Sequence, residues 1–211
     1  MSIDPIYEGI QRFREHEFPR RREAFEALSS GQQPRLLLIT CSDSRIDPAL
    51  LTQTDPGDLF VVRNAGNLVP PSDAGPGGEA ATIEYGIEAL GIRDIAVCGH
   101  AHCGAMAALR DRASAAELAC VPPWLEHAQP ALARRVRVGD GQDPLTNTVG
   151  ANVLAQLDNL RTHPFVARAI ENDGLRLHGW VYDFVTGELY VSDEAGKFHA
   201  LSGGATEDLA W

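Results

Sequence analysis

Apolar runs bounded by turn signals predict the strands of this protein. Residues 36–40 (LLLIT) form a continuous apolar run. Such a run is typical of a strand that is buried on both faces of a parallel sheet. The predicted strands are residues 36–40, 58–63 and 95–98, and a C-terminal hairpin of residues 175–184 and 188–192 around the turn at 186–187.

Segments with helical spacing alternate with these strands. Residues 6–30 combine apolar positions with many charges, and Pro19 should break or kink this helix. Further helices are expected at residues 79–90, 104–112 and 146–172, the last interrupted at 162–164. The alternation predicts one α/β domain over residues 1–211: a mostly parallel central sheet of about four strands, with an edge hairpin strand, flanked by helices.

Composition narrows the class of protein. The chain has 211 residues, 44% of them hydrophobic and 22% charged, which is enough to bury a globular core. A formal net charge of −11 argues against a nucleic-acid partner. We see no apolar run of membrane-span length and no secretory signal at the N-terminus. We therefore expect a cytoplasmic protein with its four cysteines reduced, and a bacterial microcompartment stays open as its place within the cytoplasm.

Two polar clusters follow predicted strands. Cys41, Asp43 and Arg45 come directly after the first strand, and His100 and Cys103 come after the third. Open parallel sheets build their sites at the carboxyl ends of the strands. Cys41, His100 and Cys103 are zinc-type ligands, which leaves a fourth position to water or to Asp43. Three protein ligands with one open place are typical of a catalytic zinc.

A disulfide between Cys41 and Cys103 is the main alternative to a metal site. It would not explain why His100 lies three residues before Cys103, nor why a carboxylate and a guanidinium follow Cys41. Cys98 and Cys120 have no ligand-type neighbour at useful spacing. We expect Cys98 in the core and Cys120 as a structural or surface thiol.

The sequence resembles the β-class carbonic anhydrases over most of its length. Several long motifs in the right order make this resemblance far more specific than any one of them. It implies a lyase that binds one Zn²⁺ per chain and reversibly hydrates carbon dioxide to bicarbonate and a proton. The motifs are residues 41–45 (CSDSR), 61–69 (VVRNAGNLV), 83–85 (IEY) and 99–104 (GHAHCG).

The resemblance also implies roles for three residues whose surroundings indicate nothing special. Taken alone, Gln32 is a solvated loop residue, Phe60 a core residue and Tyr85 a half-buried helix residue. In the family, the Gln amide points at the substrate, the Phe lines the wall of the site, and the Tyr ring lies at its mouth. We therefore predict that Gln32, Phe60 and Tyr85 bind substrate.

Assembly follows from the same three residues. They would not easily reach one zinc from one chain, and the family's site lies at a dimer interface. The resemblance therefore predicts a homodimer or a dimer of dimers, with the helical arm of residues 1–30 packing on a partner subunit. A solvated surface helix is the plain alternative for this charged arm.

Charge balance predicts a catalytic dyad of Asp43 and Arg45. Zinc with two thiolates is formally neutral, and Asp43 as a fourth ligand would make the centre anionic and exclude water. Arg45 can grip the carboxylate bidentately and keep it off the metal. Asp43 then accepts the proton of a zinc-bound hydroxide and aims a lone pair at carbon dioxide. The alternative is a structural ion pair, which is less expected beside a ligand cysteine.

Three other functions remain open at this stage. Hydrolysis of carbonyl sulfide or carbon disulfide would use the same zinc site, and the residues barely discriminate between these substrates. A zinc-binding regulatory module would not need the dyad, and a structural zinc would need a fourth cysteine or histidine.

Within the resembled family, one branch closes its zinc with the aspartate and holds bicarbonate beside a tryptophan. Leu38 occupies that position here, which favours the open branch.

Overall fold

A computed structural model describes residues 2–141 and 143–201, and the chain divides into two compact units, Met1–Gln33 and Pro34–Trp211. The first unit contains α1 (Asp4–Arg12), a π-helical segment (Phe13–Glu17) and α2 (Phe18–Leu28). Pro19 lies in the first turn of α2, where a missing N–H costs nothing. The expected irregularity therefore falls in the π-helical segment just before Pro19 rather than inside α2.

The first unit carries a stripe of apolar side chains that are exposed to solvent. None of the residues of α1, the π-helical segment or α2 is buried. The spacing of the stripe places its side chains on one face of the helix. Its members are Ile3, Ile6, Tyr7, Ile10 and Phe13, each at least 44% exposed.

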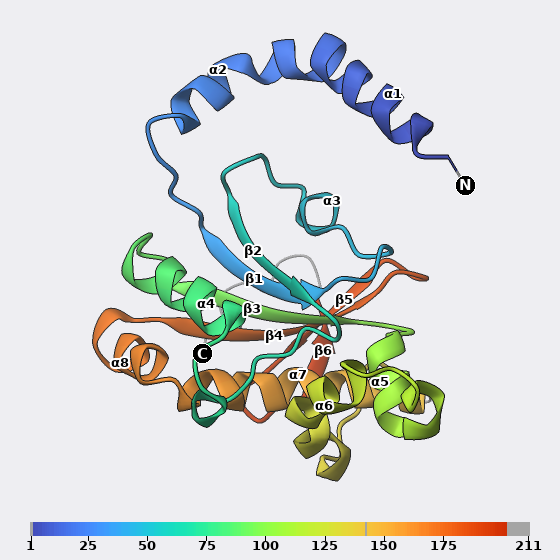
Figure 1. The fold of residues 1–211 in the computed structure, drawn as a ribbon. Coiled ribbons are helices and arrows are strands. Elements are labelled where there is room, and N and C mark those ends of the chain that lie inside the picture. Colours follow the sequence, from blue (N-terminus) through green and yellow to red (C-terminus); the bar gives the residue numbers. More distant parts are fainter. Residues whose placement is uncertain (1, 142, 202–211) are drawn as a thin grey trace. The chain divides into compact units, whose positions relative to one another are not determined.

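The second unit is built on a six-stranded sheet of order β2-β1-β3-β4-β5-β6 (Figure 1). The strands β2, β1, β3 and β4 are parallel, and β5 and β6 continue the sheet antiparallel to their neighbours. The predicted fold class is confirmed, but the sheet is larger than expected because a three-residue strand is too short to show alternation. The strands are β1 (Leu36–Cys41), β2 (Leu59–Asn64), β3 (Asp94–His100), β4 (Arg176–Asp183), β5 (Glu188–Ser192) and β6 (Phe198–Ala200).

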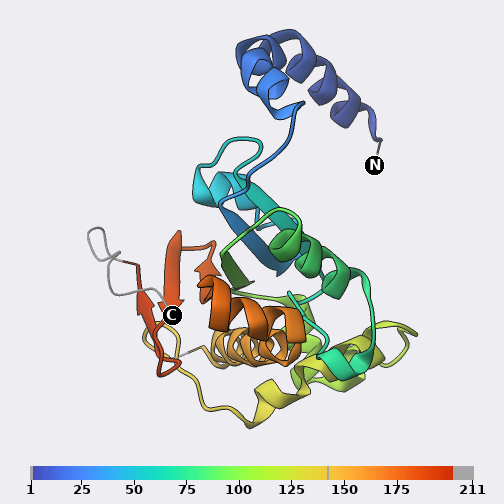
Figure 2. The ribbon, with the colours of Figure 1, turned by 90° about the vertical axis from the view of Figure 1, so that its left-hand side faces the viewer.

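Helices α4, α7 and α8 form a layer against the sheet. Helix α7 packs on β3 and β4, α8 packs on α7, and α4 packs on α8 and β2 (Figures 1 and 2). A Cβ atom at Gly99 would collide with Val149 of α7, so glycine is what lets α7 approach β3 closely. The helices are α3 (Pro48–Thr52), α4 (Gly78–Glu88), α5 (Gly104–Arg110), α6 (Val121–Leu125), α7 (Pro144–Thr162) and α8 (Pro164–Asp173), with 3-10 segments at Ser72–Ala74, Arg112–Ala115 and Glu126–Ala133.

The register of the sheet brings the two polar clusters to one edge. Strands β1 and β3 are direct parallel neighbours, with Thr40 opposite Cys98. They end at Cys41 and His100, so the loops that follow them meet at the carboxyl edge of the sheet. None of the helices in residues 2–141 and 143–201 has the length and apolar character needed to span a bilayer.

Candidate metal centre

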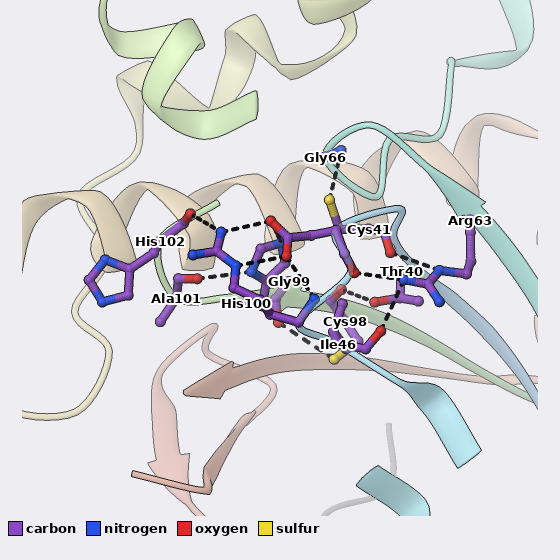
Figure 3. A network of polar contacts seen from close by, with 12 residues as sticks. Thr40, Cys41, Ile46, Arg63, Gly66, Cys98, Gly99, His100, Ala101 and His102 are labelled. Atoms are coloured by element: carbon purple, nitrogen blue, oxygen red, sulfur yellow. Dashed lines mark hydrogen bonds and ion pairs between the residues drawn. The ribbon is translucent and has the colours of Figure 1, made fainter. Parts of the chain in front are cut away.

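Three ligand-type side chains meet where β1 and β3 end. The sulfur atoms of Cys41 and Cys103 and a ring nitrogen of His100 all lie within 4.8 Å of one another, and all three residues are buried. Cys41 is the last residue of β1 and His100 the last of β3 (Figure 3). Cys103 is the residue before α5. The structure thus brings together the three residues that sequence spacing selected as metal ligands.

The histidine presents the right nitrogen to a metal. His100 Nδ1 lies 2.9 Å from the carbonyl oxygen of Ala101, which can only accept, so Nδ1 carries the proton. His100 Nε2 is buried and makes no hydrogen bond within the described residues. A buried nitrogen without a partner is costly unless something binds it. Two sulfurs and one imidazole nitrogen are ligands that suit Zn²⁺, so these residues fit a zinc ion.

The surroundings favour ionisation of a ligand thiol. A hydrogen bond from the Cys103 thiol lowers the pKa of Cys41, against the effect of burial, and His100 and the Gly66 N–H, 3.4 Å from the sulfur, lower it further. Sharing that proton with Cys41, together with burial, raises the pKa of Cys103. One thiolate is therefore already favoured in the protein, and metal binding would deprotonate the second thiol.

Asp43 is gripped by Arg45 beside these ligands. Arg45 Nε donates to Asp43 Oδ1 at 2.8 Å and Nη2 donates to Oδ2 at 2.7 Å, and the Arg45 backbone N–H also donates to Oδ1 at 3.0 Å. The side-chain hydrogen bonds from Arg45 hold the pKa of Asp43 far below its usual range, although burial acts to raise it. Asp43 Oδ2 lies 3.9 Å from His100 Nε2. The ionised Asp43 carboxylate therefore lies beside His100 but beyond hydrogen-bonding distance of its Nε2 atom.

Arg63 is a site residue for which the sequence predicted no role. Its Nε donates to the carbonyl of Cys41 at 3.0 Å, and its Nη2 donates to the carbonyls of Asp43 and Ile46 at 2.8 and 2.9 Å (Figure 3). Arg63 reaches them from β2, where it is paired with Thr40 of β1. These bonds fix the backbone that carries the Asp43 side chain. An arginine inside an otherwise apolar strand was the available signal.

Phe184 is a second residue that the sequence did not indicate. It follows β4, and the Arg45 guanidinium carbon lies 4.7 Å from its ring centroid. Arg45 Nη2 also donates to the carbonyl of His102 at 3.0 Å. Arg45 therefore has partners on three separate segments of the chain.

Two of the predicted substrate residues, Phe60 and Tyr85, lie away from the carboxyl edge of the sheet within the chain's own fold. The rings of Phe60 and Tyr85 are 6.1 Å apart, and Tyr85 is 52% exposed. On β2, however, Asn64 is the residue opposite Cys41, and Phe60 precedes Asn64 by four residues. Four residues of strand span about 13 Å. Gln32 lies in the exposed loop at the end of the first unit, and substrate binding by all three residues stays a prediction.

Comparisons with known proteins agree with this geometry. A family model described as carbonic anhydrase matches residues 36–189. A carbonic anhydrase of Pseudomonas aeruginosa is 47% identical over 194 residues, 91% of this chain and 88% of that protein. Carbonic anhydrase 1 of Escherichia coli O157:H7 is 44% identical over 196 residues, 91% of this chain and 89% of that protein.

Solved structures place the fold in the same group. The β-carbonic anhydrase CcaA superposes with a TM-score of 0.87 at 43% identity, covering 96% of this chain and 93% of that one. A structure from a study of two tetrameric β-carbonic anhydrases of the ascomycete Sordaria macrospora superposes with a TM-score of 0.73 at 28% identity, covering 89% and 95%. The chain therefore belongs to the carbonic anhydrases, which are lyases, and within them to the β class.

Proposed function

We propose that this protein binds one Zn²⁺ per chain through Cys41, His100 and Cys103 and reversibly hydrates carbon dioxide to bicarbonate and a proton. The observation that carries the proposal is a buried sulfur–nitrogen–sulfur ligand set with a firmly held carboxylate beside it. Membership of the family supports the reaction, and the ligand types support the metal.

The chain's own residues would orient the attack. A zinc ion bound here would acidify a bound water and so supply a nucleophile near neutral pH. Asp43 Oδ1 already accepts two hydrogen bonds, while Oδ2 accepts one from Arg45. A carboxylate oxygen has two lone pairs, so Oδ2 keeps one free on the side of His100. We propose that this lone pair of Oδ2 accepts a hydrogen bond from the O–H group of the nucleophile. That hydrogen bond would orient a lone pair of the nucleophile's oxygen toward the carbon of the substrate.

Arg45 has a second role in this proposal, which is to keep Asp43 off the metal. A free carboxylate so close to the ligands would compete for the fourth position. With two thiolates already present, a third anionic ligand would give the centre a negative charge. The bidentate grip of Arg45 holds both oxygens in place and offsets the charge of Asp43.

We also propose that the site is completed by a second copy of the chain. Phe60 lies about 13 Å along β2 from the carboxyl edge, and the Tyr85 ring on α4 is 6.1 Å from it, so both are better placed to line the site of a partner. The uncovered apolar stripe on α1 supports packing on another subunit. The tetrameric state named for the Sordaria macrospora proteins supports a dimer or a dimer of dimers here.

We assign the site to the open branch, in which bicarbonate does not lock it. Leu38 is fully buried within β1 and has no donor to offer an anion. The donor atoms that Arg63 directs at this loop already serve three backbone carbonyls. Bicarbonate should therefore inhibit with a simple hyperbolic curve. A sigmoidal curve in a stopped-flow titration would contradict this assignment.

The proposed function is tested by stopped-flow hydration of carbon dioxide with a pH indicator on zinc-loaded protein. The parent should accelerate hydration, and Asp43→Ala should keep its zinc while losing roughly 10²- to 10⁴-fold in rate, the range typical of a positioned acid–base group. The same samples are assayed with carbonyl sulfide and carbon disulfide. Turnover of those gases without hydration of carbon dioxide, or a fully active Asp43→Ala variant, would refute the proposal.

A further inference from the structure

We infer that Phe184 is a positioning residue. Its ring contacts the Arg45 guanidinium and keeps it in the orientation that binds both oxygens of Asp43, so that the Asp43 carboxylate stays beside the metal ligands. This inference rests on the proposed role of the Asp43–Arg45 pair. A guanidinium carbon 4.7 Å from the ring centroid is within the range of about 6 Å for a cation–π contact. The guanidinium carbon lies over the ring, and the N–H donors of the same guanidinium bond to Asp43 and to the His102 carbonyl.

The edge and the face of Arg45 are held by different parts of the fold. Its edge donates to both oxygens of Asp43 and to the carbonyl of His102 at 3.0 Å. These hydrogen bonds use the N–H groups at the edge of the guanidinium, so they leave its faces to other contacts. The Arg45 side chain is 45% exposed, so solvent would replace the ring if Phe184 were absent.

The ring of Phe184 is itself fixed by the turn that carries it. Asp183 Oδ1 accepts from the Val185 N–H at 2.9 Å, and the Asp183 carbonyl accepts from the Gly187 N–H at 2.8 Å. Gly187 has φ 79°, a left-handed conformation that favours glycine. The turn between β4 and β5 is therefore closed on both sides of Phe184. These hydrogen bonds hold the backbone from which the Phe184 side chain projects.

The same ring also lies near one candidate ligand, His100. Its centroid is 6.4 Å from that of His100 and 5.7 Å from that of His102. The Ala101 N–H donates to the carbonyl of Tyr182 at 2.8 Å, which ties the loop after β3 to the end of β4. Phe184 thus packs at the point where a ligand histidine and the arginine that grips Asp43 meet.

Filling space is the competing explanation for a half-buried phenylalanine. An aliphatic side chain at position 184 would fill most of that space but would offer no aromatic face to Arg45. Phe184→Leu therefore separates the two roles, and Phe184→Tyr, which keeps the ring, should restore whatever Leu removes. Val185, in the same turn and 68% exposed, supplies the matched control Val185→Ala.

The first measurement is kinetic. With zinc content equal to the parent's, Phe184→Leu should lower kcat by about two- to thirtyfold, the range that a cation–π contact supports. Phe184→Tyr and Val185→Ala should match the parent. Loss of kcat in Phe184→Leu that Phe184→Tyr does not restore would overturn the inference, because the aromatic face would not be the cause.

The second measurement needs neither metal nor turnover. In metal-free protein, proton–nitrogen NMR of the Arg45 Nε–H should show an upfield ring-current shift that Phe184→Leu abolishes and Phe184→Tyr keeps. An unshifted Arg45 signal in the parent would overturn the inference even if Phe184→Leu failed to fold. If Asp43→Ala is impaired while Phe184→Leu equals the parent in both measurements, this inference alone fails. A normal Asp43→Ala variant would remove the proposed dyad and the inference together.

Discussion

The two ends of the β1–β2 strand pair show what one chain completes and what it leaves open. At the carboxyl end, where Cys41 lies opposite Asn64, the three ligand residues are buried and their ligand atoms lie within 4.8 Å of one another. Near the amino end, where Leu37 lies opposite Phe60, the Phe60–Tyr85 pair is partly exposed. The proposed ligands and the Asp43–Arg45 pair lie together at one edge of the chain, whereas Phe60 and Tyr85 lie away from it. We take this difference as the physical reason for the proposed assembly.

The largest effect should come from removing a proposed ligand at the carboxyl end of β1. Cys41→Ser should lose zinc because a thiolate that its neighbours help to ionise is replaced by a weakly acidic hydroxyl. The loss of zinc affinity should exceed the roughly 10- to 100-fold loss typical when only a group supporting a ligand is removed. Zinc is counted per chain after dialysis against a chelator, with the exposed Cys120→Ser as the control. A Cys41→Ser protein that retains one zinc per chain would remove Cys41 from the site.

Whether Phe60 of one chain lines the site of another is tested by combining two defective chains. Cys41→Ser lacks a ligand but has an intact wall, and Phe60→Ala has intact ligands but a damaged wall. Each variant alone should hydrate carbon dioxide poorly. In a dimer of the two, one site would combine good ligands with a good wall, so random 1:1 assembly should restore about a quarter of parental activity.

Co-expressed, doubly tagged pairs provide the sample for this complementation test. The pair of parent and Cys41→Ser gives the reference for a mixed dimer with one working site. Activity of the mixed Cys41→Ser and Phe60→Ala dimer no greater than the mean of the separate variants would show that Phe60 serves its own chain or no site at all.

The sequence predicted features that depend on neighbouring residues better than contacts between distant segments. The apolar run at 36–40 became β1 (Leu36–Cys41), and the break at 162–164 became the boundary between α7 and α8, because burial and proline act locally. The candidate ligand set was predictable because Cys41 and His100 end neighbouring strands and Cys103 lies in the short loop after β3. The contacts of Arg63 and Phe184 could not be predicted, although an arginine in an apolar strand was a signal for Arg63, because strand register brings both residues to the site from distant segments. Residues that serve another chain leave no trace in one chain's contacts.

A smaller effect is expected at Asp94, at the amino end of β3 away from the metal ligands. Burial acts to raise the pKa of Asp94, but hydrogen bonds from Arg176 and His178, at 2.6 and 2.8 Å, outweigh it and lower the pKa. A carboxyl whose pKa is lowered by folding stabilises the fold above its unfolded pKa of about 3.9 and loses that contribution as the pH falls below it.

Asp94→Asn should therefore be less stable than the parent by at most about 1 kcal/mol at pH 6, the upper value for a partly exposed ion pair. The gap between the two proteins should shrink on acidification toward pH 3. Urea unfolding at both pH values measures the free energy of unfolding, with the exposed Asp73→Asn as a control for charge alone. A gap that is constant or widens on acidification would contradict the assigned pKa direction.

A crystal structure of the zinc-loaded protein near neutral pH would show whether Arg45 keeps Asp43 off the metal. We predict zinc bound by Cys41, His100 and Cys103, with both Asp43 oxygens still on Arg45 as they are here. In crystals of Arg45→Ala, the freed Asp43 should close onto the zinc. Parental crystals with the Asp43 carboxylate bonded to zinc at neutral pH would contradict this role of Arg45.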